Sequence, residues 1–421
     1  MRLVTQLLAA SVCFWSASLA NAQQSTGSDS STGRLPEHGL AVGDWLLYPE
    51  LSTGVTVNDN VFRKNFNQKT QAGFTLSPSF VAVRDAGIHK TTVFGSLEAQ
   101  TYGGVGSATN LQGQFGFAHD YEAERDLVFH VDGKFTRQIG AFGNLANSEL
   151  VGTYSPSGAL PLIVIGSPFI GNLFASNRPS NQFNGSVSVE KKFGRAFVDV
   201  FASAQALRYD GVSTLGLNGQ TYSIGARGGY WISPQIYSFV ETAMLWHQYS
   251  GVGLDSHGYR VLTGLGTDQL GLFRGQVYVG LQSQSGATLV GNSQLSPVVG
   301  GQLSYYPTAY LTFVAQVDQD LGVAAPSVIV AQYTTSTRAS LAAQYAFSPY
   351  WSATSRFGAL FTRFQSDKTH DQAWFAGLGL SYTFWRNVAL TADYQHVSSI
   401  SHVSASSYRQ NIYTIGMNYR Y

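Results

Sequence analysis

The chain has 421 residues, of which 12% are charged, 13% are aromatic and 45 are glycine, and its formal net charge is +1. A typical soluble domain has about 25% charged residues, so this composition argues against an ordinary soluble protein. It suits many strands with aromatic girdles and tight turns. The near-neutral charge gives no sign of a nucleic-acid partner or of a strongly anionic ligand.

The amino terminus has the pattern of a secretory signal. Arg2 supplies a positive start, residues 7–15 form a short apolar core, and residues 20–22 read Ala-Asn-Ala, so we expect cleavage after Ala22. A buried N-terminal helix is the alternative, but a polar tract follows at once. Cys13 is the only cysteine and lies inside this segment. The mature chain would therefore have no thiol, which excludes cysteine catalysis and thiolate metal sites.

After this signal, no apolar run approaches the roughly 18 residues that a spanning helix needs. The longest, Leu160–Ile165, is interrupted by Pro161. An exported chain without such a helix is periplasmic, secreted, or a barrel in the outer membrane. We assign residues 1–22 to the signal, 23–46 to a flexible periplasmic segment rich in Ser, Thr, Gly and Gln at its start, and 47–421 to a barrel.

The last strand carries the clearest membrane pattern. One face has Ile412, Thr414, Gly416, Asn418 and Arg420, which are small or polar after the first residue. The opposite face is apolar and ends on an aromatic residue at the carboxyl terminus, as in the closing strand of outer-membrane barrels. We expect this strand to pair with the first strand, because an open edge is not tolerated in lipid. We also expect the barrel-assembly machinery to recognise the apolar face, which consists of Tyr413, Ile415, Met417, Tyr419 and Tyr421.

Turn signals recur along the chain at a hairpin spacing, with one longer gap. They occur at Asp85–Gly87, Glu122–Arg125, Phe193–Arg195, Ser233–Pro234, Asp268–Gly271, Tyr306–Thr308, Ser348–Pro349 and Trp385–Asn387. Eight short turns separate nine hairpins, so we predict about eighteen strands. This is an even number, as bacterial barrels require. Sixteen is the second choice, because weak strands such as 294–305, which contains Pro297, are open to misreading.

Alternation within the predicted strands supports a barrel over a soluble sandwich. Val131 and Leu390 belong to long alternating runs, whereas sandwich strands have about 5–6 residues. The sequence therefore predicts an all-β, transmembrane, antiparallel up-and-down barrel. With a periplasmic amino terminus, the tight turns lie on the periplasmic side, and nearby aromatic residues form the inner girdle. These residues are Tyr121, Trp231, Tyr305, Trp351 and Trp385.

The stretch from Gly39 to Arg63 resembles the start of the Putative beta-barrel porin 2 family. That family shows a glycine-containing lead-in, an apolar patch ending in proline, a first strand, and Asp-Asn followed by an apolar or aromatic pair. The matching residues are Gly39, Gly43, Leu46, Leu47, Pro49, Gly54, Asp59, Asn60, Val61 and Phe62. The resemblance implies an outer-membrane barrel, often associated with exopolysaccharide systems, and it implies no particular substrate.

The longer gap between turn signals contains a predicted third extracellular loop, residues 141–181. Its segment Ala159–Phe174 is apolar, and an apolar loop should not extend freely into water. It could fold into the barrel and narrow the pore, as the third loop of general porins does. A lid or partner-docking patch at the outer rim is a second interpretation. An additional hairpin is the third.

Residues expected to point inward fall into two groups. The pore-lining candidates are Glu98, Asp132, Lys134, Asp199, Arg227, Glu241, Arg260, Arg274, Asp318, Arg338, Arg356 and Asp393. These charges either set solute preference at a constriction or form ion pairs that stiffen the wall, and their near balance of sign favours the ion pairs. The aromatic candidates are Phe94, Phe197, Phe201, Phe239 and Tyr278. They could stack on sugar rings or simply pack.

Enzyme patterns are weak. The sequence contains no Gly-x-Ser-x-Gly elbow and no His-Glu-x-x-His run. His247, Asp255 and His257 form the best cluster near one outer loop, and chance proximity explains it better than catalysis. Asp59-Asn60 could bind a cation, although Asx residues are also ordinary turn residues. We therefore expect no catalytic residue, no metal and no cofactor.

The leading functional hypothesis is a channel for a polar solute, with a link to exopolysaccharide export by resemblance. A scaffold barrel with a plugged lumen and a rim-active hydrolase are the alternatives. The expected partners are outer-membrane lipid, the barrel-assembly machinery, and polysaccharide-export or periplasmic components.

Overall fold

The structure is a computed structural model that describes residues 39–103, 108–139, 179–210, 218–250, 255–286, 293–324, 332–365, 368–401 and 407–420. Within these ranges the regular structure consists of strands, and none of the described segments is a helix with the length and apolarity to cross a membrane. The predicted signal (1–22), the apolar loop segment 159–174 and Tyr421 lie outside the described residues.

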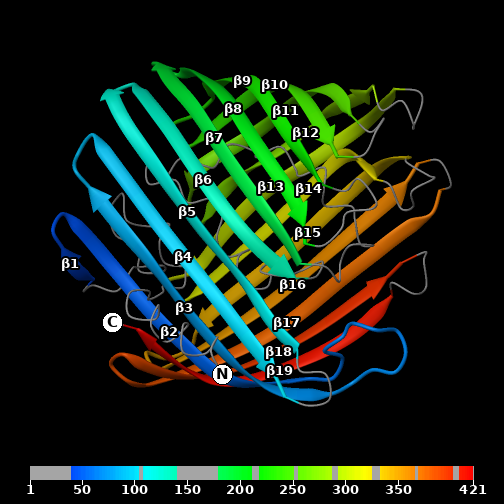
Figure 1. Ribbon diagram of the computed structural model, residues 1–421. Helices are drawn as coiled ribbons and strands as arrows, with labels where there is room; N and C mark the ends of the chain where they lie inside the picture. Colours follow the sequence, from blue (N-terminus) through cyan, green and yellow to red (C-terminus); the bar gives the residue numbers. More distant parts are fainter. Residues whose placement is uncertain are drawn as a thin grey trace.

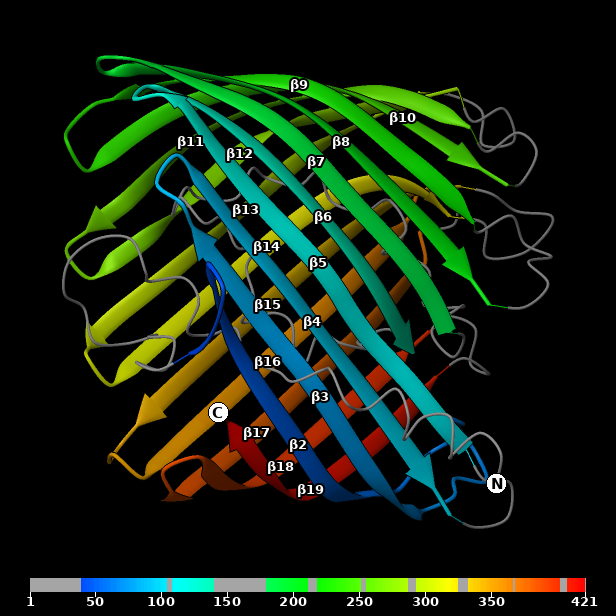
Figure 2. The same ribbon diagram turned by 60° about the vertical axis from the view of Figure 1, so that its left-hand side comes forward.

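Eighteen of the nineteen described strands form a closed antiparallel barrel. Each strand from β2 to β19 pairs with the next one along the chain, and β19 pairs with β2. Figures 1 and 2 show these strands as one continuous, strongly tilted wall around an interior. The prediction of an eighteen-stranded barrel closed by its last strand is therefore confirmed over the sixteen-stranded alternative.

The strand bounds follow directly from the alternating segments. They are β1 Leu40–Val42, β2 Trp45–Asn58, β3 Gln71–Asp85, β4 His89–Tyr102, β5 Ala108–Glu124, β6 Leu127–Ile139, β7 Pro179–Phe193, β8 Ala196–Tyr209, β9 Gly219–Trp231, β10 Ile236–Tyr249, β11 Ser256–Leu270, β12 Phe273–Ser285, β13 Gln294–Thr308, β14 Leu311–Ala324, β15 Gln332–Ala346, β16 Trp351–Phe364, β17 His370–Trp385, β18 Val388–Ile400 and β19 Tyr408–Arg420.

Eight short connections lie between strands β3 to β18, at or directly beside the eight expected turn signals. They are residues 86–88, 125–126, 194–195, 232–235, 271–272, 309–310, 347–350 and 386–387. The agreement arises because Gly, Pro, Asn and Asp act locally in turns. The strand β1 was not expected. It lies inside the segment 23–46, which the sequence assigns as flexible, and it pairs with the start of β2.

The two faces of the wall differ in exposure. In β10, Val240 and Met244 are 52% and 60% exposed, whereas the intervening Glu241 is 1% exposed. The exposed face is the outer one, because in a closed barrel side chains from other parts of the wall can cover only the inner face. Val131 and Leu390 are 37% and 49% exposed and lie outside, as the alternation predicted. Tyr413, Ile415 and Met417 are likewise exposed on the outer face of β19.

The barrel is closed by side chains as well as by the β2–β19 ladder. Asp59 accepts hydrogen bonds from the backbone N–H of Asn411 at 2.7 Å and from its side-chain amide at 2.5 Å. The fully buried Asn60 donates to the carbonyls of Lys64 and Arg409, both at 2.8 Å. Asp59 and Asn60 therefore join the first barrel strand to the last. This is a structural reason for the Asp-Asn pair that follows β2 in the Gly39–Arg63 motif.

Candidate functional site: the inner wall

A row of charged side chains crosses the inner face of β8, β9 and β10. The strand register places Asp199, Arg227 and Glu241 directly opposite one another. Arg227 donates to one oxygen of Glu241 through Nη2 at 2.6 Å and through Nε at 3.0 Å. Arg260 of β11 donates to the other oxygen at 3.3 Å. Glu241 thus bridges two arginines.

This charged cluster is covered rather than open to the lumen. Glu241 and Arg260 are each 1% exposed, and Arg227 is 5% exposed. Arg227 also lies over the ring of Phe239, with its guanidinium carbon 4.7 Å from the ring centroid. Burial of charges is costly unless they are paired, so the two arginines and Glu241 behave as one unit that stiffens the wall. Among the described residues, Nε and Nη1 of Arg260 have no hydrogen-bond partner.

A second ion pair spans three strands. Arg356 of β16 pairs with Asp393 of β18, passing over β17. The crossing is possible because β17 has glycine at this point: a Cβ at Gly377 would lie 3.3 Å from the Arg356 Nε, and a Cβ at Gly379 would lie 3.0 Å from the carboxylate of Asp393. Small inner residues thus let long side chains lie along the wall.

The other charged candidates also lie on the inner face. Glu98 accepts hydrogen bonds from Gln100 at 2.5 Å and Gln112 at 3.0 Å. Asp132 accepts one from Ser186. Asp318 accepts one from the hydroxyl of Tyr278 at 2.8 Å.

The last three charged candidates are basic and half-buried on the same face. Arg338 lies opposite Asp318 in the register, whereas Lys134 and Arg274 lie on β6 and β12. Whether the charged candidates line a conducting pore stays a prediction.

The five aromatic candidates share one arrangement that sequence analysis missed. Each lies directly opposite a glycine of the following strand, and a Cβ at that glycine would clash with the aromatic side chain. The pairs are Phe94 with Gly116, Phe197 with Gly229, Phe201 with Gly225, Phe239 with Gly264 and Tyr278 with Gly300. Each side chain therefore lies flat on the wall and covers the backbone of its neighbour.

This arrangement limits what the aromatic residues can do. Their exposed fractions are only 2–8%, and three of them join the cluster Phe197, Tyr237, Phe239, Leu262, Tyr278 and Val298. Little ring face is left to stack on a sugar, so packing explains these residues better than a sugar path. Both residue types are visible in the sequence, but the pairing appears only when the strand register is known.

The residues considered for catalysis do not converge. His247 is 2% exposed on the inner face and its Nδ1 lies 3.0 Å from the Thr221 hydroxyl. His257, at the next register position across the hairpin, is exposed on the outer face. Asp255 accepts a hydrogen bond from the backbone of Tyr249 at 2.8 Å. The described ranges contain no group of three His, Cys, Asp or Glu residues suited to a metal ion.

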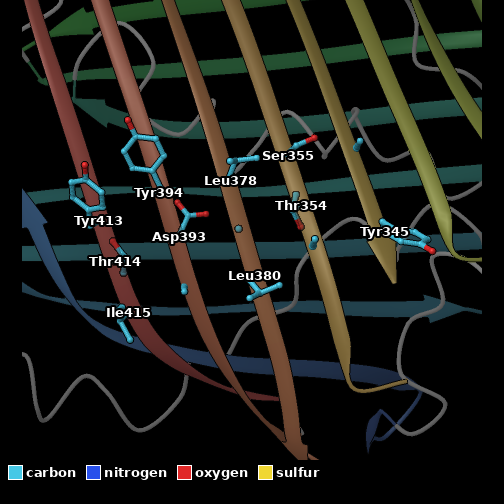
Figure 3. A pocket seen from close by; sticks show the side chains of 14 residues that line it. Tyr345, Thr354, Ser355, Leu378, Leu380, Asp393, Tyr394, Tyr413, Thr414 and Ile415 are labelled. Carbon is cyan, nitrogen blue, oxygen red and sulfur yellow. The ribbon is translucent and has the colours of Figure 1, made fainter. Parts of the chain in front are cut away.

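The outer face has a hollow across β15–β19 (Figure 3). Its lining includes the small residues Ala343, Ala353 and Ala392. The larger side chains of Leu378 and Tyr413 project from β17 and β19 beside it. Its volume is about 500 Å³. Its only charged lining residue, Asp393, is paired on the inner face, so the hollow fits lipid chains.

The chain is similar, at low sequence identity, to several solved structures. The chain is similar to a BenF-like porin from Pseudomonas fluorescens Pf-5, with 10% identity, 90% of this chain and 100% of that one covered, and a TM-score of 0.43. It is also similar to the outer membrane channel DcaP of Acinetobacter baumannii, with 11% identity, coverages of 91% and 99%, and a TM-score of 0.40. An anion-selective porin from Comamonas acidovorans has 12% identity, coverages of 90% and 99%, and a TM-score of 0.36. Likenesses of this degree say nothing about the solute.

No curated protein sequence matches the chain. The model of the family described as Putative beta-barrel porin 2 matches residues 164–421, which is more than half of the chain. This match lies beyond the amino-terminal motif at Gly39–Arg63, so the two observations are independent. Together with the closed barrel, it establishes an outer-membrane protein of porin type: the chain belongs to the Putative beta-barrel porin 2 family.

Proposed function

We propose that this barrel is an outer-membrane channel through which a polar solute passes. The observation that carries the proposal is the division between the two faces of a closed wall. The outer face exposes Val131, Val240 and Met244 to lipid, whereas the inner face has charged and amide side chains. A polar lining is what a water-filled barrel requires.

The inner charges support a channel of modest charge selectivity. Several acidic and basic groups on this face form ion pairs, as Arg227 does with Glu241 and Arg356 with Asp393. Paired charges produce a weak net field, and a channel with such a wall would favour neutral or weakly charged polar solutes. The family resemblance adds an exopolysaccharide or one of its building blocks as the solute class in this proposal.

Single-channel conductance in planar bilayers tests the channel. We expect discrete current steps from the purified, folded barrel. Lys134 lies half-buried on the inner face of β6, so Lys134→Glu should shift the reversal potential in a salt gradient toward cations. Lys191→Glu is the matched control, because it changes the charge by the same amount at a residue that lies near the short-turn end and pairs with Glu124 and Asp126. A shift of equal size in the control would contradict a lumen role for Lys134.

The saccharide part of the proposal has its own measurement. Neutral oligosaccharides of increasing length should interrupt the open-channel current in a concentration-dependent manner. Chloride salts of small organic cations provide the comparison. If only the organic cations interrupt the open-channel current, saccharides are excluded as the solute class, whereas the proposal of a channel still stands.

A scaffold barrel with a closed lumen is the second candidate, and one observation favours it. On the inner face, Phe239, Arg260 and Leu262 are 2%, 1% and 0% exposed, so part of the lining is covered. A barrel that carries no current, either as the full chain or after deletion of 159–174, would support the scaffold. Current that appears only after the deletion would support a channel narrowed by that loop.

A further inference from the structure

Among the described strands, the pairing between β13 and β14 covers only part of their length. These strands pair only where Gly301–Thr308 meets Leu311–Val317. Beyond Gly301, β13 remains paired with β12 as far as Gln294, and β14 remains paired with β15 as far as Ala324. The two strands therefore separate toward the end of the barrel that has the longer connections (Figure 2).

The separation changes the packing of β14. Gln282 of β12 donates a hydrogen bond to the backbone carbonyl of Leu321 at 3.0 Å, so β14 approaches β12 past β13. Leu321 is fully buried although its position in the alternation belongs to the outer face, where Val317 is 40% exposed. One edge of β13, with Pro297 in it, is left without a strand partner among the described residues.

A groove lies along this separation, and we call it the seam groove. Its volume is about 620 Å³. Its lining residues are Gln294, Leu295, Ser296, Pro297, Gln319, Thr335, Thr337, Phe361, Thr362, Arg363, Gln365, Lys368, His370 and Asp371. Phe361 and Leu295 are 50% and 54% exposed, which places the groove on the outer face of the wall.

Three basic side chains lie together at the end of the seam groove that is nearest the rim. Arg363 and His370 are directly opposite in the β16–β17 register, and Lys368 belongs to the connection between these strands. All three are exposed, and the described residues provide none of them with an ion-pair partner. Asp371 also lines the groove; it is buried and accepts a hydrogen bond from the Ser401 hydroxyl at 3.1 Å.

The seam groove has both polar and apolar residues along the strands. Thr335 lies opposite Arg363, and its hydroxyl accepts a hydrogen bond from Gln365 at 2.8 Å. Phe361 and Pro297 lie two residues further from the rim than Arg363 and Leu295, respectively. A groove with basic side chains at its rim end and with exposed Leu295, Pro297 and Phe361 on the lipid-facing side is complementary to an amphiphile with a negatively charged head.

The geometry points to a binding site for a phosphorylated membrane lipid in the seam groove. Arg363 and Lys368 bind the phosphate, since guanidinium and ammonium groups form charge-assisted hydrogen bonds with phosphate oxygens. An acyl chain lies against Phe361 and Pro297. The hollow of Figure 3 lacks a basic rim, so it holds acyl chains without selecting a headgroup.

Native mass spectrometry of the full barrel in detergent tests the site. The probes are a bisphosphorylated lipid A and the same lipid after removal of both phosphates. We expect the phosphorylated form to bind the wild-type barrel more tightly, by at least about fivefold for each basic contact of roughly 1 kcal/mol. Equal affinity for the two probes would overturn the proposal, and this comparison requires no variant. Because conductance is not measured, the result does not depend on the proposed channel.

Two variants and a control locate the site. Arg363→Gln combined with Lys368→Gln should remove the preference for the phosphorylated probe, whereas Arg363→Lys should retain most of it. Arg409→Gln is the matched control, because Arg409 is an exposed residue near the same rim that does not line the seam groove. Loss of the preference in the control as well, or its survival in the double variant, would show that phosphate is attracted by the rim in general. Heat-modifiability on gels confirms that each variant is folded.

Discussion

At the scale of single residues, the inner wall depends on glycines that accommodate rings. Phe197 lies on Gly229, and the preceding residue, Gly228, has no atom within 4 Å of a Cβ placed there. Gly229→Ala should displace the ring and destabilise the barrel by about 1–3 kcal/mol, as overpacking does. Gly228→Ala should be neutral or slightly stabilising, because alanine loses less chain entropy than glycine. Urea unfolding of the folded barrel in detergent compares them, and equal effects would contradict the pairing.

Glu241 provides a second prediction at this scale. Its carboxylate is the bridge between Arg227 and Arg260, and all three side chains are buried. Glu241→Gln would leave two buried guanidinium groups without that charge, and we expect a loss of about 3–5 kcal/mol. Glu124→Gln breaks an exposed pair with Lys191 and should cost no more than about 1 kcal/mol. Similar unfolding midpoints for the two variants would mean that the cluster is solvated.

The limits of sequence analysis differ for these residues. Alternation predicts that Glu241 and Phe197 point inward, because a two-residue period follows from strand geometry alone. It did not reveal that Glu241 bridges two arginines or that Phe197 covers Gly229. Such contacts depend on register between strands, and the sequence contains no local signal for register in the middle of a strand.

At the scale of elements, the Asp59-Asn60 connection holds the first and last strands together. Asn60 is fully buried and forms hydrogen bonds with Lys64 and Arg409, and its carbonyl accepts one from Gln410. Asn60→Ala should therefore destabilise the closed barrel by about 1–3 kcal/mol through unsatisfied buried groups. The control is Gln68→Ala, which removes one exposed hydrogen bond in the same connection. Unchanged heat-modifiability of Asn60→Ala would exclude this role.

Elements were predicted unevenly from the sequence. The eight short turns were found because their residues act locally, whereas closure through Asp59 and Asn411 joins positions far apart in the chain. The short β1 was missed because three residues cannot show alternation. The separation of β13 from β14 was also missed, although Pro297 signalled a weak strand there.

A pH-dependent contact connects β6, β7 and the end of β8. Asp210 accepts hydrogen bonds from Arg137 at 2.5 Å and from Asn181 at 2.8 Å. The hydrogen bond from Arg137 lowers the pKa of the Asp210 carboxyl below its usual range. A depressed carboxyl pKa stabilises the fold above the pKa of the unfolded state, and this stabilisation is lost as pH falls through the folded value.

The consequence can be measured with Asp210→Asn. At neutral pH the variant should be less stable than wild type by no more than about 1 kcal/mol, because the pair is partly exposed to solvent. The difference should begin to shrink as pH falls below about 4, the ordinary carboxyl pKa, and should disappear once pH is below the depressed pKa of the folded state. Urea midpoints of both proteins at several pH values give the comparison. A stability difference that grows on acidification would contradict a lowered pKa of Asp210 in the folded state.

At the scale of the whole molecule, the outward face must lie in lipid, and a charge placed there tests the position of the bilayer. Val131 is 37% exposed near the middle of β6, so Val131→Arg should destabilise the barrel by about 2–4 kcal/mol if this position is at mid-bilayer. His130→Arg places the same charge one residue away on the inner face, where Asp120 lies 2.7 Å from the native imidazole. Arginine can retain that pair, so the inner variant should remain close to wild type. Reversible unfolding in vesicles measures both. A tolerated Val131→Arg together with a damaging His130→Arg would mean that lipid and water lie on the opposite faces of the wall, and the channel proposal would fail with it.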